Sequence, residues 1–197
     1  MKKLLLLFVL FIALGQSLMF LKQQWMDRII AECEVREAAL RSEYNSRIEN
    51  LTRVHKLSNK IKTVNAELSD EYALYLASII NNRAKDPELI VALTTVESRF
   101  VSDLVGRHQD TGYMQILPST AKALGYEDAD LRDPEDNFSI GIPYLESLIA
   151  KYGLEEGVSR YRCGQKKDCV KTKLSKTYVQ RVMSLYSKLQ ENKNSKM

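Results

Sequence analysis

A glutamate interrupts the apolar face of a predicted helix. The stretch "DPEL" at 86–89 is typical of a helix start, with Asp86 as the N-terminal cap and Pro87 in the first turn. At 100° per residue, the residues that follow form one apolar stripe, which consists of Leu89, Leu93, Val96 and Phe100. Glu97 projects into the same arc, so its carboxyl is predicted to lie against the core.

Burial gives this carboxyl one particular chemistry. Desolvation disfavours the ionised form and raises the pKa, and a carboxyl that stays protonated near neutral pH can act as a general acid. Glycosidases use such an acid to protonate a glycosidic oxygen. The alternative is a glutamate at the edge of the core that pairs with Arg99, and periodicity alone favours this structural interpretation.

A second segment with binding chemistry follows Glu97. In "GYMQILPSTAKALG" a loop that begins at Gly112 precedes a short helix, which is predicted to start at Pro118 and stop at Gly125. Gln115 can donate and accept hydrogen bonds from sugar hydroxyl and amide groups. Met114 would offer an adaptable apolar wall.

Several motifs in order resemble the catalytic domain of lytic transglycosylases of the soluble-lytic-transglycosylase type. They are "ESRF" at 97–100, "GYMQILPSTA" at 112–121, "DPEDNFSIGIPYL" at 133–145, the segment around Tyr161 and "TYVQRVMSLY" at 177–186. The resemblance covers about 100 residues, from near Asp86 to Tyr186. It implies an all-α, lysozyme-like domain that cleaves the β-1,4 bond between N-acetylmuramic acid and N-acetylglucosamine in peptidoglycan and leaves a 1,6-anhydro end.

The same resemblance implies roles for individual residues. Glu97 resembles the catalytic acid and Ser98 its polar companion, and Tyr161 resembles the tyrosine that positions the acid. The substrate-binding segment corresponds to Gly112, Met114 and Gln115, supported by Tyr113, which stands where leucine is commoner. The third motif departs from the family, because "RYRCG" places Arg162 where an asparagine is usual. We expect no cofactor.

Two other functions remain open. A hydrolytic muramidase would need a second carboxylate, which Asp103 or Asp110 could supply, although solvated loop residues are the favoured interpretation of both. A catalytically silent, peptidoglycan-binding scaffold in an envelope or phage-derived assembly is suggested by the altered third motif and by the long helix near the N-terminus.

The cysteines are interpreted for a chain that lies outside the cytoplasm, where disulfides persist. Cys163 and Cys169 enclose "GQKKD" and are expected to form a disulfide, whereas Cys33 is left over as a small hydrophobe or an intermolecular bridge. A metal site is not expected, because His55 and His108 have no ligand spacing with the cysteines.

The N-terminus predicts export. Lys2 and Lys3 precede an apolar run over 4–21, which is either a cleaved signal peptide or, as we favour, an uncleaved anchor about 27 Å long with Trp25 at the interface. We therefore expect an extracytoplasmic enzyme at the inner membrane, in the periplasm or cell envelope, or secreted if the signal is cleaved.

The remaining organisation follows from composition. Residues 25–69 lack Pro and Gly and predict one or two stalk helices, whose interrupted apolar spacing permits at most weak homo-oligomers. The expected domain covers 70–188, where Pro143 should kink a helix or mark its start, and a polar tail covers 189–197. With 45% hydrophobic residues the chain can bury one core, and a net charge of +4 without a dense basic patch argues against a nucleic-acid partner.

Overall fold

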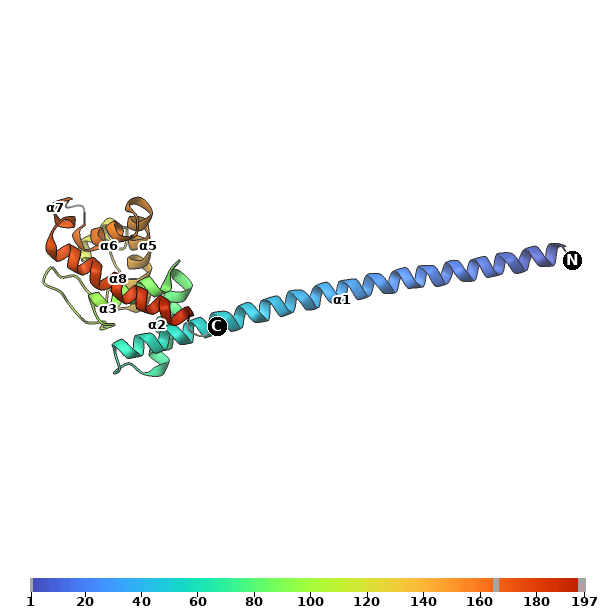
Figure 1. Ribbon diagram of the computed structural model, residues 1–197, viewed down its shortest axis with the longest axis horizontal. Coiled ribbons are helices and arrows are strands. Elements are labelled where there is room, and N and C mark those ends of the chain that lie inside the picture. Colours follow the sequence, from blue (N-terminus) through green and yellow to red (C-terminus); the bar gives the residue numbers. More distant parts are fainter. Residues whose placement is uncertain (1, 165–166, 195–197) are drawn as a thin grey trace. The chain divides into compact units, whose positions relative to one another are not determined.

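Helices account for nearly all regular structure in the computed structural model, which describes residues 2–164 and 167–194 (Figure 1). Within these ranges there is no strand, only isolated β-bridges that join Thr111 to Val105 and to Ile116. The all-α prediction is confirmed. In chain order the helices are α1 (Lys2–Val64), α2 (Asp70–Arg83), α3 (Pro87–Glu97), α4 (Pro118–Ala123), α5 (Pro134–Tyr152), α6 (Leu154–Cys163), α7 (Lys167–Val170) and α8 (Lys173–Asn194).

The chain divides into two units, and the first, which ends at Leu51, consists of the N-terminal part of α1. Its apolar residues over 4–21 are exposed, and this stretch has the length and composition of a membrane-spanning helix. Farther along, Arg41 pairs with Glu37 at 2.6 Å and Arg47 with Glu43 at 2.8 Å. Such pairs one turn apart each stabilise an exposed helix by about 0.3 kcal/mol. Helix α1 covers the stretch from residue 25 to Val64, most of the expected stalk, without a break.

The second unit begins at Thr52 and includes the last turns of α1, where Leu57 and Ile61 are buried. Short local signals begin its helices. The side chain of Ser69 accepts a hydrogen bond from the amide of Tyr72 at the start of α2, and Asp86 accepts one from Leu89 at the start of α3. The cap at Asp86 starts α3 where the sequence predicts it.

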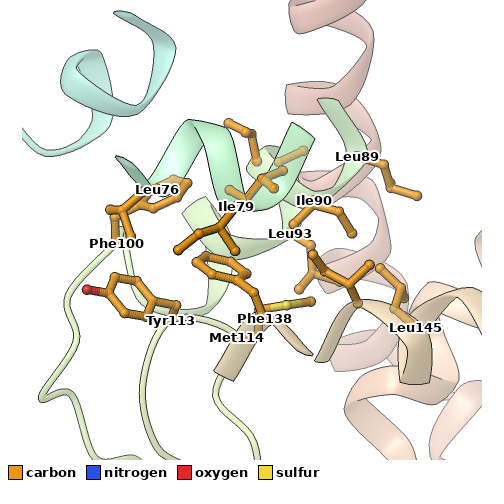
Figure 2. Packing of buried hydrophobic residues seen from close by; sticks show 14 of the residues in the cluster. Leu76, Ile79, Leu89, Ile90, Leu93, Phe100, Tyr113, Met114, Phe138 and Leu145 are labelled. Carbon is orange, nitrogen blue, oxygen red and sulfur yellow. The ribbon is translucent and has the colours of Figure 1, made fainter. Parts of the chain in front are cut away.

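Helix α3 is the most buried element of this unit. It packs against α2 and α8, while α5 packs against α2 and α6 (Figure 1). Figure 2 shows Leu89, Ile90 and Leu93 of α3 meeting Phe138 and Leu145 of α5 within one apolar cluster. Because α3 is covered on several sides, its last residue, Glu97, lies at the edge of the protein interior.

Helix α5 corrects one expectation. It starts at Pro134, where the side chain of Asp133 accepts a hydrogen bond from the amide of Asp136, and Pro143 lies inside it. Pro143 therefore does not mark the start of the helix. It lies on the exposed side, where water can bond the carbonyl that its missing N–H leaves free.

Helix α8 continues to Asn194, beyond the domain end expected at residue 188. Leu189 packs partly against the core, and its carbonyl accepts a hydrogen bond from Lys60 Nζ at 2.9 Å. The last residues of the expected polar tail, 195–197, lie outside the described ranges.

A buried amide holds the loop between α3 and α4. Asn137 is fully buried, and its Nδ2 donates to the carbonyls of Leu131 at 2.7 Å and Thr111 at 3.1 Å. Its Oδ1 accepts from the amide of Met114 at 2.9 Å. Beside it, Gly112 has a φ of 79°, and a Cβ there would lie 2.0 Å from the carbonyl oxygen of Leu131. Glycine is therefore the only residue at position 112 that lets the loop come this close to its neighbours.

We predict that Asn137→Ala lowers the free energy of unfolding by about 3 kcal/mol, because the Met114 amide and the Leu131 carbonyl lose this partner and the Thr111 carbonyl keeps only the amide of Ile116. Urea unfolding of the full chain in detergent, followed by circular dichroism, measures the change. Asn59→Ala, at an exposed position of α1, is the matched control and should shift stability by no more than about 0.5 kcal/mol. Equal stability of the two variants would show that the Asn137 amide does not hold the loop.

Candidate active site

Glu97 is the last residue of α3, and the chain turns sharply after it. Arg99 and Phe100 have φ values of 55° and 62°, a left-handed conformation that costs about 1 kcal/mol or more for residues with a side chain. The turn is fixed by the side chain of Ser98, which accepts a hydrogen bond from the amide of Phe100 at 3.1 Å. It buries Phe100 in the core and leaves Glu97 at the bend.

A tyrosine from α8 bonds the acid directly. The hydroxyl of Tyr178, whose side chain is almost fully buried, donates a hydrogen bond to Glu97 Oε1. Arg162 lies over the Tyr178 ring, with its Cζ 5.0 Å from the ring centroid. Burial, with the neighbouring Glu97 carboxyl, raises the pKa of Tyr178 well above its ordinary value, so the hydroxyl stays a hydrogen-bond donor.

The environment keeps the acid protonated up to neutral pH. Burial raises the pKa of Glu97 from 4.5 to about 7. The hydrogen bond from Tyr178 and the charge of Arg162 act in the opposite direction, and the charge of Asp110 adds to the rise. Desolvation dominates, which is the effect that a general acid requires.

The 112–115 segment contributes mainly through its backbone. Tyr113 and Met114 are fully buried, and Figure 2 shows both side chains inside the apolar cluster, where Tyr113 stacks on Phe138 with ring centroids 5.3 Å apart. Met114 is therefore not an apolar wall for a sugar. Its sulfur occupies the space that Gly141 leaves open, since a Cβ at Gly141 would lie 2.5 Å from Met114 Sδ.

Hydrogen bonds from distant residues hold this backbone in place. Ser98 Oγ donates to the carbonyl of Tyr113 at 2.6 Å, and the Tyr161 hydroxyl donates to the carbonyl of Met114 at 2.9 Å. Gln115 has a φ of 49°, and its Nε2 donates to the carbonyls of Gly112 and Leu104, both at 2.9 Å. Ser98 and Tyr161 thus bond the loop, and Tyr178 bonds the acid.

Two grooves in the second unit share Glu97. The first, here called the Tyr161 groove, has a volume of about 780 Å³, and its lining includes Glu97, Asp110, Gln115, Tyr144, Tyr161 and Arg162. The second, here called the α8 groove, has a volume of about 810 Å³, and its lining includes Glu97, Arg99, Leu104, Gln180, Arg181 and Leu185. The acid is therefore accessible from both grooves although most of its surface is covered.

A disulfide closes the end of the Tyr161 groove. Cys163 and Cys169 are joined, and both line the groove together with Gly164. Part of the loop that they enclose, residues 165–166, lies outside the described ranges. The bond links the C-terminal end of α6, which carries Tyr161 and Arg162, to α7. Cys33, in the first unit, is free and exposed.

The two candidate second carboxylates lie in different places. Asp110 lines the Tyr161 groove, where its Oδ1 accepts a hydrogen bond from the amide of His108 at 3.2 Å, whereas Asp103 is exposed and lines neither groove. In the part of the chain that the structure describes, no group of three or more His, Cys, Asp or Glu side chains could hold a metal ion.

The fold and the site define a helical protein with one largely buried carboxyl, of raised pKa, that lines two grooves. Comparison with known families agrees with this class: residues 75–182 match the model of the transglycosylase SLT domain, and the chain belongs to that family. Members of this family are typically lytic transglycosylases, which act on peptidoglycan. No solved structure matches the chain.

Sequence reasoning missed two residues of the site. Tyr178 and Asn137 both lie within quoted motifs, but neither the residue pattern nor the resemblance predicts a role for them. The signal that could have indicated Asn137 is a polar residue at a core position, which must find partners when it is buried. Nothing local indicates that the Tyr178 hydroxyl meets Glu97, 81 residues earlier in the chain.

The raised pKa of Glu97 should affect how stability, as well as activity, depends on pH. Because the native state keeps the Glu97 proton to about pH 7 while the unfolded state loses it near pH 4.5, wild-type stability falls as pH rises between these values. Glu97→Gln has no such proton. We therefore predict that the stability of this variant relative to wild type increases by roughly 3 kcal/mol between pH 4 and pH 8.

Urea unfolding at the two pH values measures the difference. Glu155→Gln makes the same substitution at an exposed position of α6 and should show no comparable trend. If the free energies of unfolding of Glu97→Gln and wild type differ by the same amount at both pH values, Glu97 has the same pKa in the folded and unfolded chains.

Proposed function

We propose that this chain cleaves the β-1,4 bond between N-acetylmuramic acid and N-acetylglucosamine in peptidoglycan without water and leaves a 1,6-anhydro end. The observation that carries the proposal is the single carboxyl with a pKa of about 7 at the junction of two grooves. A glycan strand bound beside this carboxyl would present its glycosidic oxygen to Glu97. The family match supports the substrate class.

One carboxyl suffices for both steps of this reaction. Protonated Glu97 first gives its proton to the glycosidic oxygen as the bond to the anomeric carbon of the muramic acid breaks. The C6 hydroxyl of the same sugar then bonds to the anomeric carbon and returns its proton to the Glu97 carboxylate. The enzyme regains its starting protonation state, and no water molecule is consumed.

Tyr178 makes the two oxygens of the acid unequal. Its hydroxyl donates to Oε1, so the proton of the neutral acid resides on Oε2, which remains available to the substrate. After proton transfer, the same hydrogen bond stabilises the carboxylate, because a donor favours the charged form. Tyr178 is thus a positioning residue that also limits how far burial raises the pKa of Glu97.

We predict that Glu97→Gln reduces solubilisation of purified sacculi by at least about 100-fold, because the amide keeps the shape of the acid but cannot donate its proton. Release of soluble muropeptides by the full chain in detergent gives the rate, and mass spectrometry of the products gives the reaction type. Anhydro ends, one water lighter in mass than reducing ends, are expected from wild type.

The same experiment addresses the silent scaffold. Glu155→Gln controls for the substitution itself and should keep wild-type activity. If wild type and Glu97→Gln release muropeptides equally slowly while both bind sacculi, the chain is a peptidoglycan-binding scaffold and the proposed reaction does not occur.

The pH profile should follow the acid. We predict that the rate falls as pH rises through about 7, because the first step needs protonated Glu97. Tyr178→Phe removes a hydrogen bond that lowers the pKa of Glu97, so its alkaline limb should move to higher pH even where its maximal rate is reduced. If wild type and Tyr178→Phe lose activity at the same alkaline pH, the hydrogen bond from Tyr178 does not influence the pH profile.

A hydrolytic muramidase is the second candidate, and the placement of Asp110 favours it. This carboxyl shares the Tyr161 groove with Glu97 and could serve as base for an attacking water. Products with reducing muramic acid ends, lost in Asp110→Asn, would establish hydrolysis. Anhydro products from wild type and Asp110→Asn alike would exclude that role.

The location we propose is the extracytoplasmic face of the inner membrane. The apolar stretch of α1 would serve as signal or anchor, and glycan strands would be the partner of the second unit. A disulfide beside the site suits an oxidising compartment. Self-association through residues 25–69 stays a prediction. It would be weak, because Glu37 and Arg47 place charges within the apolar spacing of this segment.

A further inference from the structure

The α8 groove has a charge pattern that the cleavage reaction does not use. Arg99 and Arg181 both line it, and neither forms a salt bridge with any residue that the structure describes. Two arginines elsewhere in the second unit are neutralised: Arg160 pairs with Glu156 at 2.8 Å, and Arg83 pairs with Glu135. Within its lining, Glu97 is the only carboxyl.

The two arginines are presented differently. Arg99 lies in the left-handed turn after α3, and its Nη2 donates to the carbonyl of Val64 at 3.3 Å, which leaves its other N–H groups for a ligand. Arg181 projects from α8 and is exposed. Between them the lining is apolar in part, through Val101, Leu104 and Leu185. This combination of guanidinium groups and aliphatic surface suits an acidic peptide with small apolar side chains.

We propose that the α8 groove binds the acidic stem peptide that peptidoglycan carries on its muramic acid, with Arg99 and Arg181 pairing with the peptide carboxylates. The inference rests on the proposed function for the source of the peptide. The bond to be cleaved belongs to the muramic acid, whose lactyl group bears the peptide, so the peptide leaves the sugar close to Glu97. Glu97 is part of the lining of the α8 groove.

The other groove is less suited to the peptide. In the lining of the Tyr161 groove the charge of Asp110 offsets that of Arg162, whereas the α8 groove carries two arginines. Gln115, Tyr144 and Tyr161 offer the amide and aromatic groups that suit sugars. In the α8 groove, a volume of about 810 Å³ falls within the range of sites for small ligands. An extended tetrapeptide is about 13 Å long. We therefore assign the glycan to the Tyr161 groove and the peptide to the α8 groove.

Binding tests the proposal without turnover. The full chain carrying Glu97→Gln, in detergent, is titrated with a soluble stem tetrapeptide, L-Ala-D-Glu-diaminopimelate-D-Ala, and with the same peptide amidated at its carboxyls. We expect Arg181→Gln and Arg99→Gln each to weaken binding of the acidic peptide about 10-fold, the effect of losing one charge-assisted contact. Arg132→Gln, at an exposed position outside both grooves, should bind normally. Equal binding of the acidic and amidated peptides, or wild-type affinity in both groove variants, would overturn the proposal.

Cleavage supplies the second arm. Without Glu97→Gln, Arg181→Gln should raise KM about 10-fold on peptide-bearing strands and leave KM unchanged on strands stripped of peptide by an amidase. Equal losses on the two substrates would contradict a peptide site. If wild type proves inert while arginine-dependent peptide binding persists, the proposed reaction fails and the peptide site stands. If wild type cleaves strands with and without peptide equally well and Arg181→Gln does not change this, the peptide site fails and the proposed reaction stands.

Discussion

The site depends on a carboxyl that must be kept from water and yet be reached by a large substrate. The solution is positional: α3 is covered by α2 and α8, and Glu97 is its last residue, where the chain bends out of the core. One turn earlier the acid would be sealed in, as Leu93 is. One turn later along a regular helix it would be solvated. The strained turn at Arg99 and Phe100 is what ends the helix at the boundary.

The loop opposite the acid is positioned by its main chain. Three side chains from distant elements converge on residues 113 and 114: Ser98 at the end of α3, Asn137 in α5 and Tyr161 in α6. Because they bond backbone groups, the side chains of the loop are free to be core residues. This explains why a segment that resembles a substrate-binding motif has two fully buried side chains. The same arrangement couples three helices to the edge of one groove.

Much of the helical framework could be predicted from local signals. Asp-Pro pairs at 86–87 and 133–134 start α3 and α5, and the apolar stripe of α3 correctly turns Glu97 inward. Local signals failed where the outcome depends on packing between distant segments. Met114 was expected at a sugar site because methionine suits one, but the gap at Gly141, which only the fold creates, holds its side chain. The partner of Glu97 could not be predicted either, because the contact requires α8 to lie against α3. Pro143 suggested a boundary, although an exposed position inside a helix also accepts it.

The close contact of loop and helix limits how such a chain can change over evolutionary time. Gly112 has no room for a Cβ because the carbonyl of Leu131 and the amide of Asn137 lie against it, and Gly141 has none because Met114 fills the space. At either glycine a new side chain forces a neighbour to move, so a change there calls for a second change beside it. Variation that alters substrate preference meets less resistance at the exposed groove residues, such as Arg99, Arg162 and Arg181, whose side chains are not packed in the core.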